Sequence, residues 1–143
     1  MEITNINSQT VAAGNNVIFT NVQIPGNCST IFQANSGLVT LRGITNGQRR
    51  ARFRLKFTGN LKASSTATVS SATLLSLAIT RNNEIISPAT MITTVEDTTS
   101  THNIGTEVLI DVPTCCCQTI SVKNISSISV DVLDANLIVE RVA

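Results

Sequence analysis

The stretch RARFRLKFT, residues 50–58, alternates strictly between polar and apolar side chains. Successive side chains of a β-strand lie on opposite faces, so Phe53, Leu55 and Phe57 share one face and the cationic residues between them share the other. A period of two predicts a strand with one buried and one solvated face, as is common in antiparallel sheets. Gly59-Asn60 follows as a turn signal and ends this strand.

Short runs of β-branched and apolar residues recur along the rest of the chain, with turn residues between them. No long stretch keeps the i, i+3, i+4 spacing of an amphipathic helix. The runs lie at residues 17–22, 38–41, 74–80, 85–86, 91–95, 104–112, 118–123, 128–132 and 136–142. Parallel strands need crossover connections, which usually contain helices, so these strands predict antiparallel sheets. The fold class is therefore all-β, as a sandwich or a barrel.

Two of these strands, Leu74–Ile79 and Leu137–Val139, are apolar on both faces. One face can fill the core, and because no helix is available the other needs a sister subunit as its cover. The expected interface residues are Leu75, Leu77, Ile79, Leu137, Ile138 and Val139. Charged residues make up only 13% of the chain, about half the usual 25%. A monomer covered by neutral Thr, Ser and Asn is the alternative.

The composition argues against several classes of partner. Ten Lys and Arg face nine Asp and Glu, so the chain lacks the basic surplus of a nucleic-acid-binding protein. Four Phe are the only aromatic residues, too few for a platform that stacks bases or sugars. No apolar run is long enough to predict a membrane span.

The sequence predicts neither an enzyme nor a bound cofactor or metal. We find no Ser/His/Asp arrangement, no paired catalytic carboxylates and no glycine-rich phosphate loop. His102 is the only histidine, and it is expected in a solvated Thr-rich loop that starts at Glu96 and Asp97. The arginines at positions 49, 50, 52 and 54 are expected to pair with Asp131, Asp134 or Glu140, with phosphate or glycan binding as the alternative.

Four stretches resemble one family in their order along the chain. They are the strand Arg52–Phe57, the hairpin Leu75–Glu84, the pair of strands within Asp111–Ser126 and the terminal Asn136–Ala143. This order resembles the trimeric jelly rolls of the C1q/TNF type, and within them the C-terminal domain of BclA-like bacterial spore glycoproteins. The resemblance implies an antiparallel jelly-roll sandwich over residues 15–143 and a homotrimer. A collagen-type Gly-X-Y stalk, which BclA-like proteins have, is missing here.

The chain is also similar to small proteins of Firmicutes and their prophages. The shared pattern stands here as Gly26–Ser29, Gly37–Gly43, Ala51–Phe57, Val112–Cys117 and Ala135–Ala143. This resemblance implies a trimeric capsid decoration or head-fibre protein of a phage that infects a Firmicutes host. The alternatives are a structural subunit of the spore surface, the exosporium or a spore appendage, and a module that binds glycans or host surfaces through a tip loop containing Glu96, Asp97 and His102.

The N-terminus lacks the basic start and apolar stretch of a signal peptide, so export by that route is not expected. Virions and spore coats both assemble inside a cell and are released by lysis, which agrees with a location on a virion or spore surface. Residues 1–14 are polar apart from Ile3, Ile6 and Val11. They are expected to form an arm that docks to the major capsid protein or to a neighbouring trimer.

Cys28 is remote in sequence from the triplet Cys115, Cys116 and Cys117. Three consecutive cysteines do not match the spacing of a zinc site, and no C-x-x-C redox motif is present. Buried free thiols or disulfides remain. Junctions between loops and strands gather at the ends of a jelly roll, so we expect a disulfide from Cys28 to Cys115 or Cys117, with Cys116 on the other face.

Overall fold

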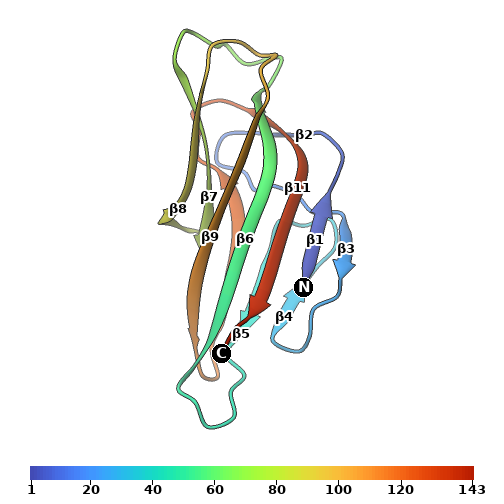
Figure 1. Cartoon of the computed structure of the whole chain (residues 1–143), viewed down its shortest axis with the longest axis vertical. Helices are drawn as coiled ribbons and strands as arrows, with labels where there is room; N and C mark the ends of the chain where they lie inside the picture. Colours follow the sequence, from blue (N-terminus) through green and yellow to red (C-terminus); the bar gives the residue numbers. More distant parts are fainter.

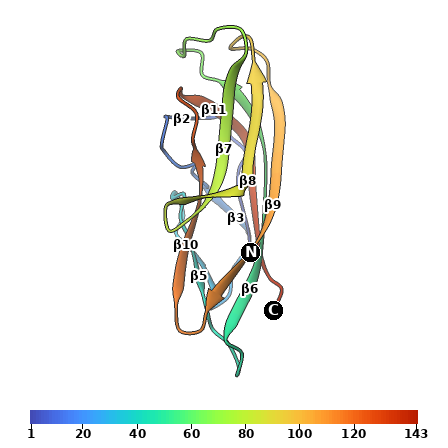
Figure 2. The same cartoon turned by 90° about the vertical axis from the view of Figure 1, so that its left-hand side faces the viewer.

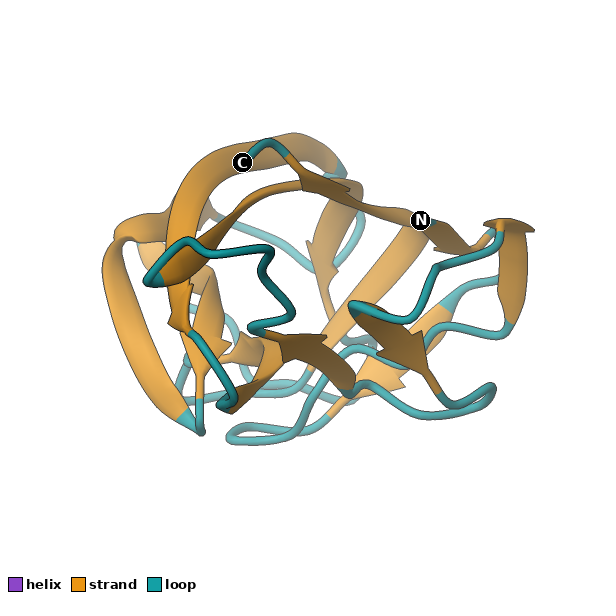
Figure 3. Ribbon diagram, turned by 90° about the horizontal axis from the view of Figure 1, so that it is seen from below, coloured by secondary structure: helices purple, strands orange, loops and turns teal.

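The computed structural model describes all residues, 1–143, and consists of strands and loops without a helix (Figures 1 and 3). The strands are β1 (Glu2–Asn5), β2 (Gln9–Val11), β3 (Asn21–Ile24), β4 (Thr30–Phe32), β5 (Val39–Arg42), β6 (Arg50–Ala63), β7 (Thr73–Arg81), β8 (Glu84–Val95), β9 (His102–Pro113), β10 (Cys117–Asn124) and β11 (Val130–Arg141). No helix is long and apolar enough to cross a membrane.

The strands form two antiparallel sheets that pack face to face (Figure 2). Sheet A has the order β3-β1-β11-β6-β9, and β2 also pairs with β11. Sheet B has the order β4-β5-β10-β7-β8. Consecutive strands often lie in different sheets, which is the arrangement of a jelly roll. The predicted all-β, antiparallel jelly-roll sandwich is confirmed.

Strand β6, which contains the alternating stretch, is a long inner strand of sheet A, between β11 and β9. It pairs with β9 from Arg50 opposite Pro113 to Leu61 opposite His102. On its other side it pairs with β11, where a bulge interrupts the register after Leu133. Its residues Phe53, Leu55 and Phe57 have no exposed surface, whereas its cationic side chains lie on the outer face.

The core is one cluster between the sheets, and it includes most of the residues that were predicted to form the subunit interface. Leu75, Leu77, Ile79 and Leu137 are fully buried within the single chain, and Val139 is only 1% exposed. Residues without accessible surface cannot contact a neighbour, so this assignment is wrong for all five. Ile138 is the exception, because it points outward and is 36% exposed.

The first fourteen residues belong to the sandwich, and the expectation of a separate arm is corrected. Strand β1 lies between β11 and β3, with Ile3 opposite Leu137 and fully buried. Val11 is also a core residue, whereas Ile6 is 64% exposed. The sequence does not show an alternating strand pattern here, because β1 and β2 are short and each contributes only one apolar side chain to the core. Whether this segment docks to a partner stays a prediction.

The sandwich is elongated, and its loops gather at two ends (Figure 1). The connections 64–72 and 96–101 form one end, here called the tip. The loop 43–49, the turn between β9 and β10 and the C-terminus form the opposite end, here called the base.

Ile3 and Ile6 provide a matched test of the N-terminal segment. Replacing Ile3 with Ala should lower the free energy of unfolding by about 2–5 kcal/mol, because it leaves a cavity beside Leu137. Replacing the exposed Ile6 with Ala should change it by less than about 0.5 kcal/mol. Denaturant unfolding measures both, and equal small effects would show that the segment is not part of the folded domain.

Candidate functional site

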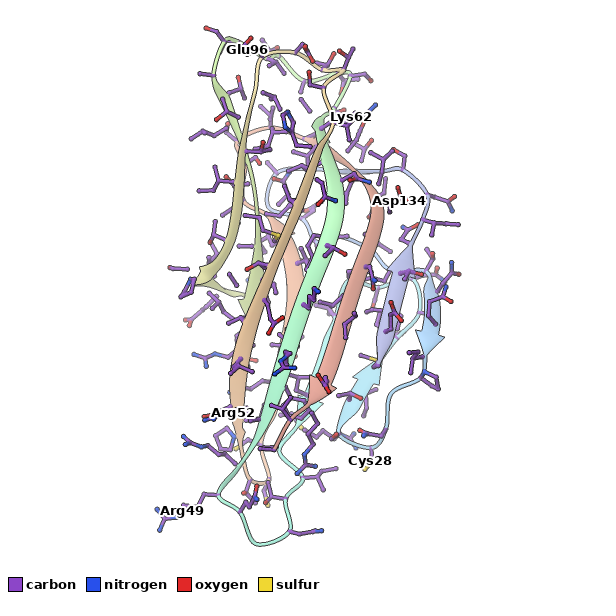
Figure 4. The ribbon with its side chains drawn as sticks, viewed as in Figure 1. Cys28, Arg49, Arg52, Lys62, Glu96 and Asp134 are labelled. Carbon is purple, nitrogen blue, oxygen red and sulfur yellow. The ribbon has the colours of Figure 1, made fainter.

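The outer face of sheet A carries a row of ion pairs across three adjacent strands (Figure 4). Arg52 on β6 donates from Nε to Asp111 Oδ1 at 2.7 Å and from Nη2 to Asp111 Oδ2 at 2.9 Å. Arg50 adds a contact from Nη1 to Asp111 Oδ2 at 3.1 Å. The hydrogen bonds from Arg52 hold the pKa of the Asp111 carboxyl below its usual value and raise the pKa of Arg52.

Arg54 joins the strands on both sides of β6. Its Nε lies 3.3 Å from Glu107 Oε1 on β9, and its Nη1 lies 3.3 Å from Glu140 Oε2 on β11. Of the three acidic residues predicted to pair with these arginines, Glu140 is therefore the one that does so. Asp131 instead accepts a hydrogen bond from Thr10, and Asp134 accepts one from Asn60.

Apolar side chains lie among these ion pairs on the same face. Leu109 is 53% exposed and Ile24 is 55% exposed, and Ile138 lies opposite Lys56 of β6. A groove of about 480 Å³ separates Ile24 from Ile138. The outer face of sheet A therefore combines exposed apolar groups with the ion pairs of Arg50, Arg52 and Arg54 and with the unpaired cation of Lys56.

The outer face of sheet B is partly covered by its own hairpin between β7 and β8 (Figure 2). Asn82 at the hairpin tip donates its N–H to Thr119 O at 2.7 Å, and its Oδ1 accepts from the Thr119 N–H at 2.9 Å. Lys123 donates to the side chain of Asn83. As a result Thr80 and Ser121, which lie on the outer side of sheet B, are almost fully buried.

The four cysteines lie toward the base, and all four are exposed free thiols (Figures 1 and 4). The predicted disulfide is absent because β5 lies between the partners. Arg42 of β5 donates its N–H to Ser29 O on one side and pairs with Cys117 on the other. Two strand spacings place Cys28 about 10 Å from the triplet, and a disulfide needs Cα atoms within about 7 Å. Their exposure also makes the reading as buried core thiols wrong.

The triplet itself closes a tight turn between the two sheets. Cys115 has a φ of 63°, and Cys116 donates its N–H to Pro113 O at 3.1 Å. Gly43 packs directly against this turn, where a Cβ atom would come within 1.9 Å of Pro113 O. The backbone of Gly43 exchanges hydrogen bonds with Cys115 and Cys116.

The predicted tip-loop residues lie in two elements, Glu96 and Asp97 in the connection between β8 and β9 and His102 in β9. Asp97 accepts backbone hydrogen bonds from Thr99 at 2.9 Å and Ser100 at 2.7 Å, which lower the pKa of its carboxyl to about 2. Glu96 is exposed at the tip. His102 is the first residue of β9 and lies opposite Leu61. The prediction that it lies within the loop is therefore wrong, because it belongs to the strand that follows the loop. No three His, Cys, Asp or Glu side chains are arranged to hold a metal ion.

Comparison with solved structures identifies the fold. The globular domain of zebrafish complement 1qA protein superposes with a TM-score of 0.58 at 10% identity, and the match covers 96% of this chain and 93% of that chain. This likeness shows a C1q-type jelly roll and, at this identity, nothing about activity. An isomalto-dextranase of Arthrobacter globiformis T6, solved with panose, matches at 7% identity with a TM-score of 0.32, over 91% of this chain and 23% of that chain, and such a score carries no argument.

No family profile matches the chain, and no curated protein matches it. The expected resemblance to BclA-like spore proteins and to prophage proteins is therefore not confirmed by these comparisons.

The two lowered carboxyl pKa values predict how the protein responds to acid. Their contribution to stability is complete above the unfolded pKa of about 3.9 and is lost as the pH falls through the folded value. An NMR titration of side-chain carboxyl carbons should give Asp97 a midpoint near pH 2 and Asp111 a midpoint below that of an exposed aspartate. Ordinary midpoints for both would mean that the hydrogen bonds from Ser100 and Arg52 do not form in solution.

The exposed thiols predict uniform reactivity. Iodoacetamide should alkylate Cys28 and all three residues of the triplet in the native protein, and reductant should leave the melting temperature unchanged. Mass spectrometry counts the added groups. A disulfide-linked peptide that joins Cys28 to the triplet within one chain would contradict the placement of β5 between them.

Proposed function

We propose that this chain is a structural surface subunit that assembles into a homotrimer and decorates the capsid, or forms a head fibre, of a phage that infects a Firmicutes host. The C1q-type fold supports the coarser statement that the chain is a structural or binding module. The resemblance to prophage proteins supports the virion, and the spore surface is the alternative location. The proposal includes no chemical reaction.

The observation that carries the trimer is the outer face of sheet A. It offers Leu109, Ile138 and Ile24 as exposed apolar groups. The charges of Arg52 and Arg54 already have partners, so a second copy can cover them without leaving them unpaired, which would be costly. Lys56 is the exception on this face, because it forms no ion pair within the chain.

The outer face of sheet B is the less suitable interface because the tip of its own β7–β8 hairpin binds back to β10. Asn82 and Asn83 bind back to β10, so a flat partner could not reach Thr80 and Ser121. We therefore place the subunit contacts on sheet A. In a particle the trimers would contact the major capsid protein or neighbouring trimers, and sheet B would face outward.

Oligomeric state tests the interface. Light scattering after gel filtration should give three times 15.2 kDa for the natural protein. Leu109→Asp or Ile138→Asp should give a folded monomer. Both positions are exposed in the single chain, so the aspartate does not disturb folding. In the trimer the same aspartate would be a buried, unpaired charge, which prevents assembly. Ile92→Asp is the matched control, since Ile92 is 62% exposed on the outer side of sheet B and should leave the trimer intact.

Two outcomes would contradict the proposal. A natural protein that stays monomeric at high concentration would rule out the trimer. Dissociation by Ile92→Asp but not by Leu109→Asp would move the interface to sheet B. Gold-labelled antibody on phage particles and on spores of a strain that carries the gene tests the location, and label confined to spores would replace the virion by its alternative.

A further inference from the structure

A polar groove crosses the outer face of sheet B beside the hairpin tip. Its floor is β10, with Thr119 and Ser121, and one wall is the hairpin with Asn82 and Asn83. Asn16 and Leu38, from the connections that precede β3 and β5, line the opposite wall. The hollow measures about 350 Å³, at the lower end of the range of about 300–1,000 Å³ that small-molecule sites occupy.

The groove presents amide and hydroxyl groups whose hydrogen-bonding capacity is only partly used. Asn16 Oδ1 is buried and has no hydrogen-bond partner. When the side chain of Asn16 turns toward a ligand, its oxygen therefore gives up no hydrogen bond within the protein. Asn82 and Asn83 use their side-chain oxygens within the protein, which leaves their NH₂ groups as donors. These two residues form the turn with φ values of 51° and 69°, and the bonds to Thr119 and Lys123 hold both amides in place.

We propose that this groove binds a neutral carbohydrate. Side-chain amides offer both donors and acceptors to sugar hydroxyls, and the exposed side chain of Leu38 offers an apolar surface to the C–H face of a pyranose ring. No charged residue lines the groove, and the nearby Lys123 is bound to Asn83, so the groove does not select an acidic sugar. A peptide strand is less well accommodated, because β10 is paired on both sides and has no free edge.

A second hollow continues the groove along the same wall. It measures about 380 Å³, shares Asn16 and Leu38 with the first and adds Asn35, Ser36 and Gln9. The two together suit an oligosaccharide rather than a single ring. Without an aromatic residue to stack on a sugar, one site should bind with a Kd on the order of 1 mM. Several copies on one assembly would raise the avidity for a glycan-coated surface.

The first hollow does not depend on the trimer, because all its residues belong to one chain and its floor, β10, is in the sheet opposite the proposed interface. It also differs from the predicted tip-loop contact. The turn between β8 and β9 is at the tip, whereas the groove lies beside the hairpin between β7 and β8 (Figures 1 and 2).

The experiment is an NMR titration of the ¹⁵N-labelled full chain with glucose, galactose, mannose, N-acetylglucosamine and their neutral disaccharides. At least one sugar should cause saturable shifts of the backbone amides of Asn16, Leu38, Asn82, Asn83 and Thr119. Asn16→Ala and Asn83→Gly should each weaken binding about three- to tenfold, as expected for one lost hydrogen bond. Glycine keeps the positive φ at position 83 while it removes the amide.

Asn46→Ala is the matched control, because Asn46 is an exposed asparagine of the base loop outside the groove. It should leave the affinity unchanged, and thermal melts should show that all three variants fold. The proposal is overturned by any of three results: no saturable shift with any sugar of the panel, shifts that cluster at residues 96–102, or an affinity that neither groove variant changes. Failure of the trimer would leave this titration unaffected.

Discussion

The structure depends on one constraint, namely that β6 is paired along both edges while its two faces meet different surroundings. Pairing with β9 and β11 satisfies its backbone, and the period of two then sends Phe53, Leu55 and Phe57 into the core. A shift of the register by one residue would bury the cations and expose the phenylalanines. The ion pairs of Arg52 with Asp111 and of Arg54 with Glu107 and Glu140 are compatible only with the observed register.

The two sheets differ in how their outer faces are covered, and the proposed roles follow from this difference. Sheet A leaves a broad face of paired charges and exposed apolar side chains, which suits contact with a second copy. Sheet B folds its own hairpin over β10, and the asparagines at the hairpin tip close one side of a small polar groove. One sandwich can therefore assemble through one sheet and bind ligands through the other.

The sequence predicted the elements whose pattern is strong and local. The alternation at 50–58, the absence of helices and the hairpin near Asn82-Asn83 all reappear in the structure. Burial of Leu75, Leu77 and Ile79 was misjudged because strand Leu74–Ile79 looks apolar on both faces, and the outer side is in fact made of Leu74, Ser76 and Ala78. The disulfide failed for a similar reason, since the sequence does not reveal that β5 separates Cys28 from the triplet. The groove beside Asn16 joins parts of the chain about a hundred residues apart, and no local motif indicates it.

Hydroxyl-radical footprinting of the assembled protein tests the central claim most directly, namely that sheet A is the face buried between subunits. Leu109, Ile138 and Ile92 are all exposed in the single chain, so each reports on its own sheet without any mutation. Oxidation of Leu109 and Ile138 should fall strongly in the assembly relative to the same protein dissociated by dilution, while Ile92 keeps its full reactivity. Protection of Ile92 with continued oxidation of Leu109 and Ile138 would contradict the account.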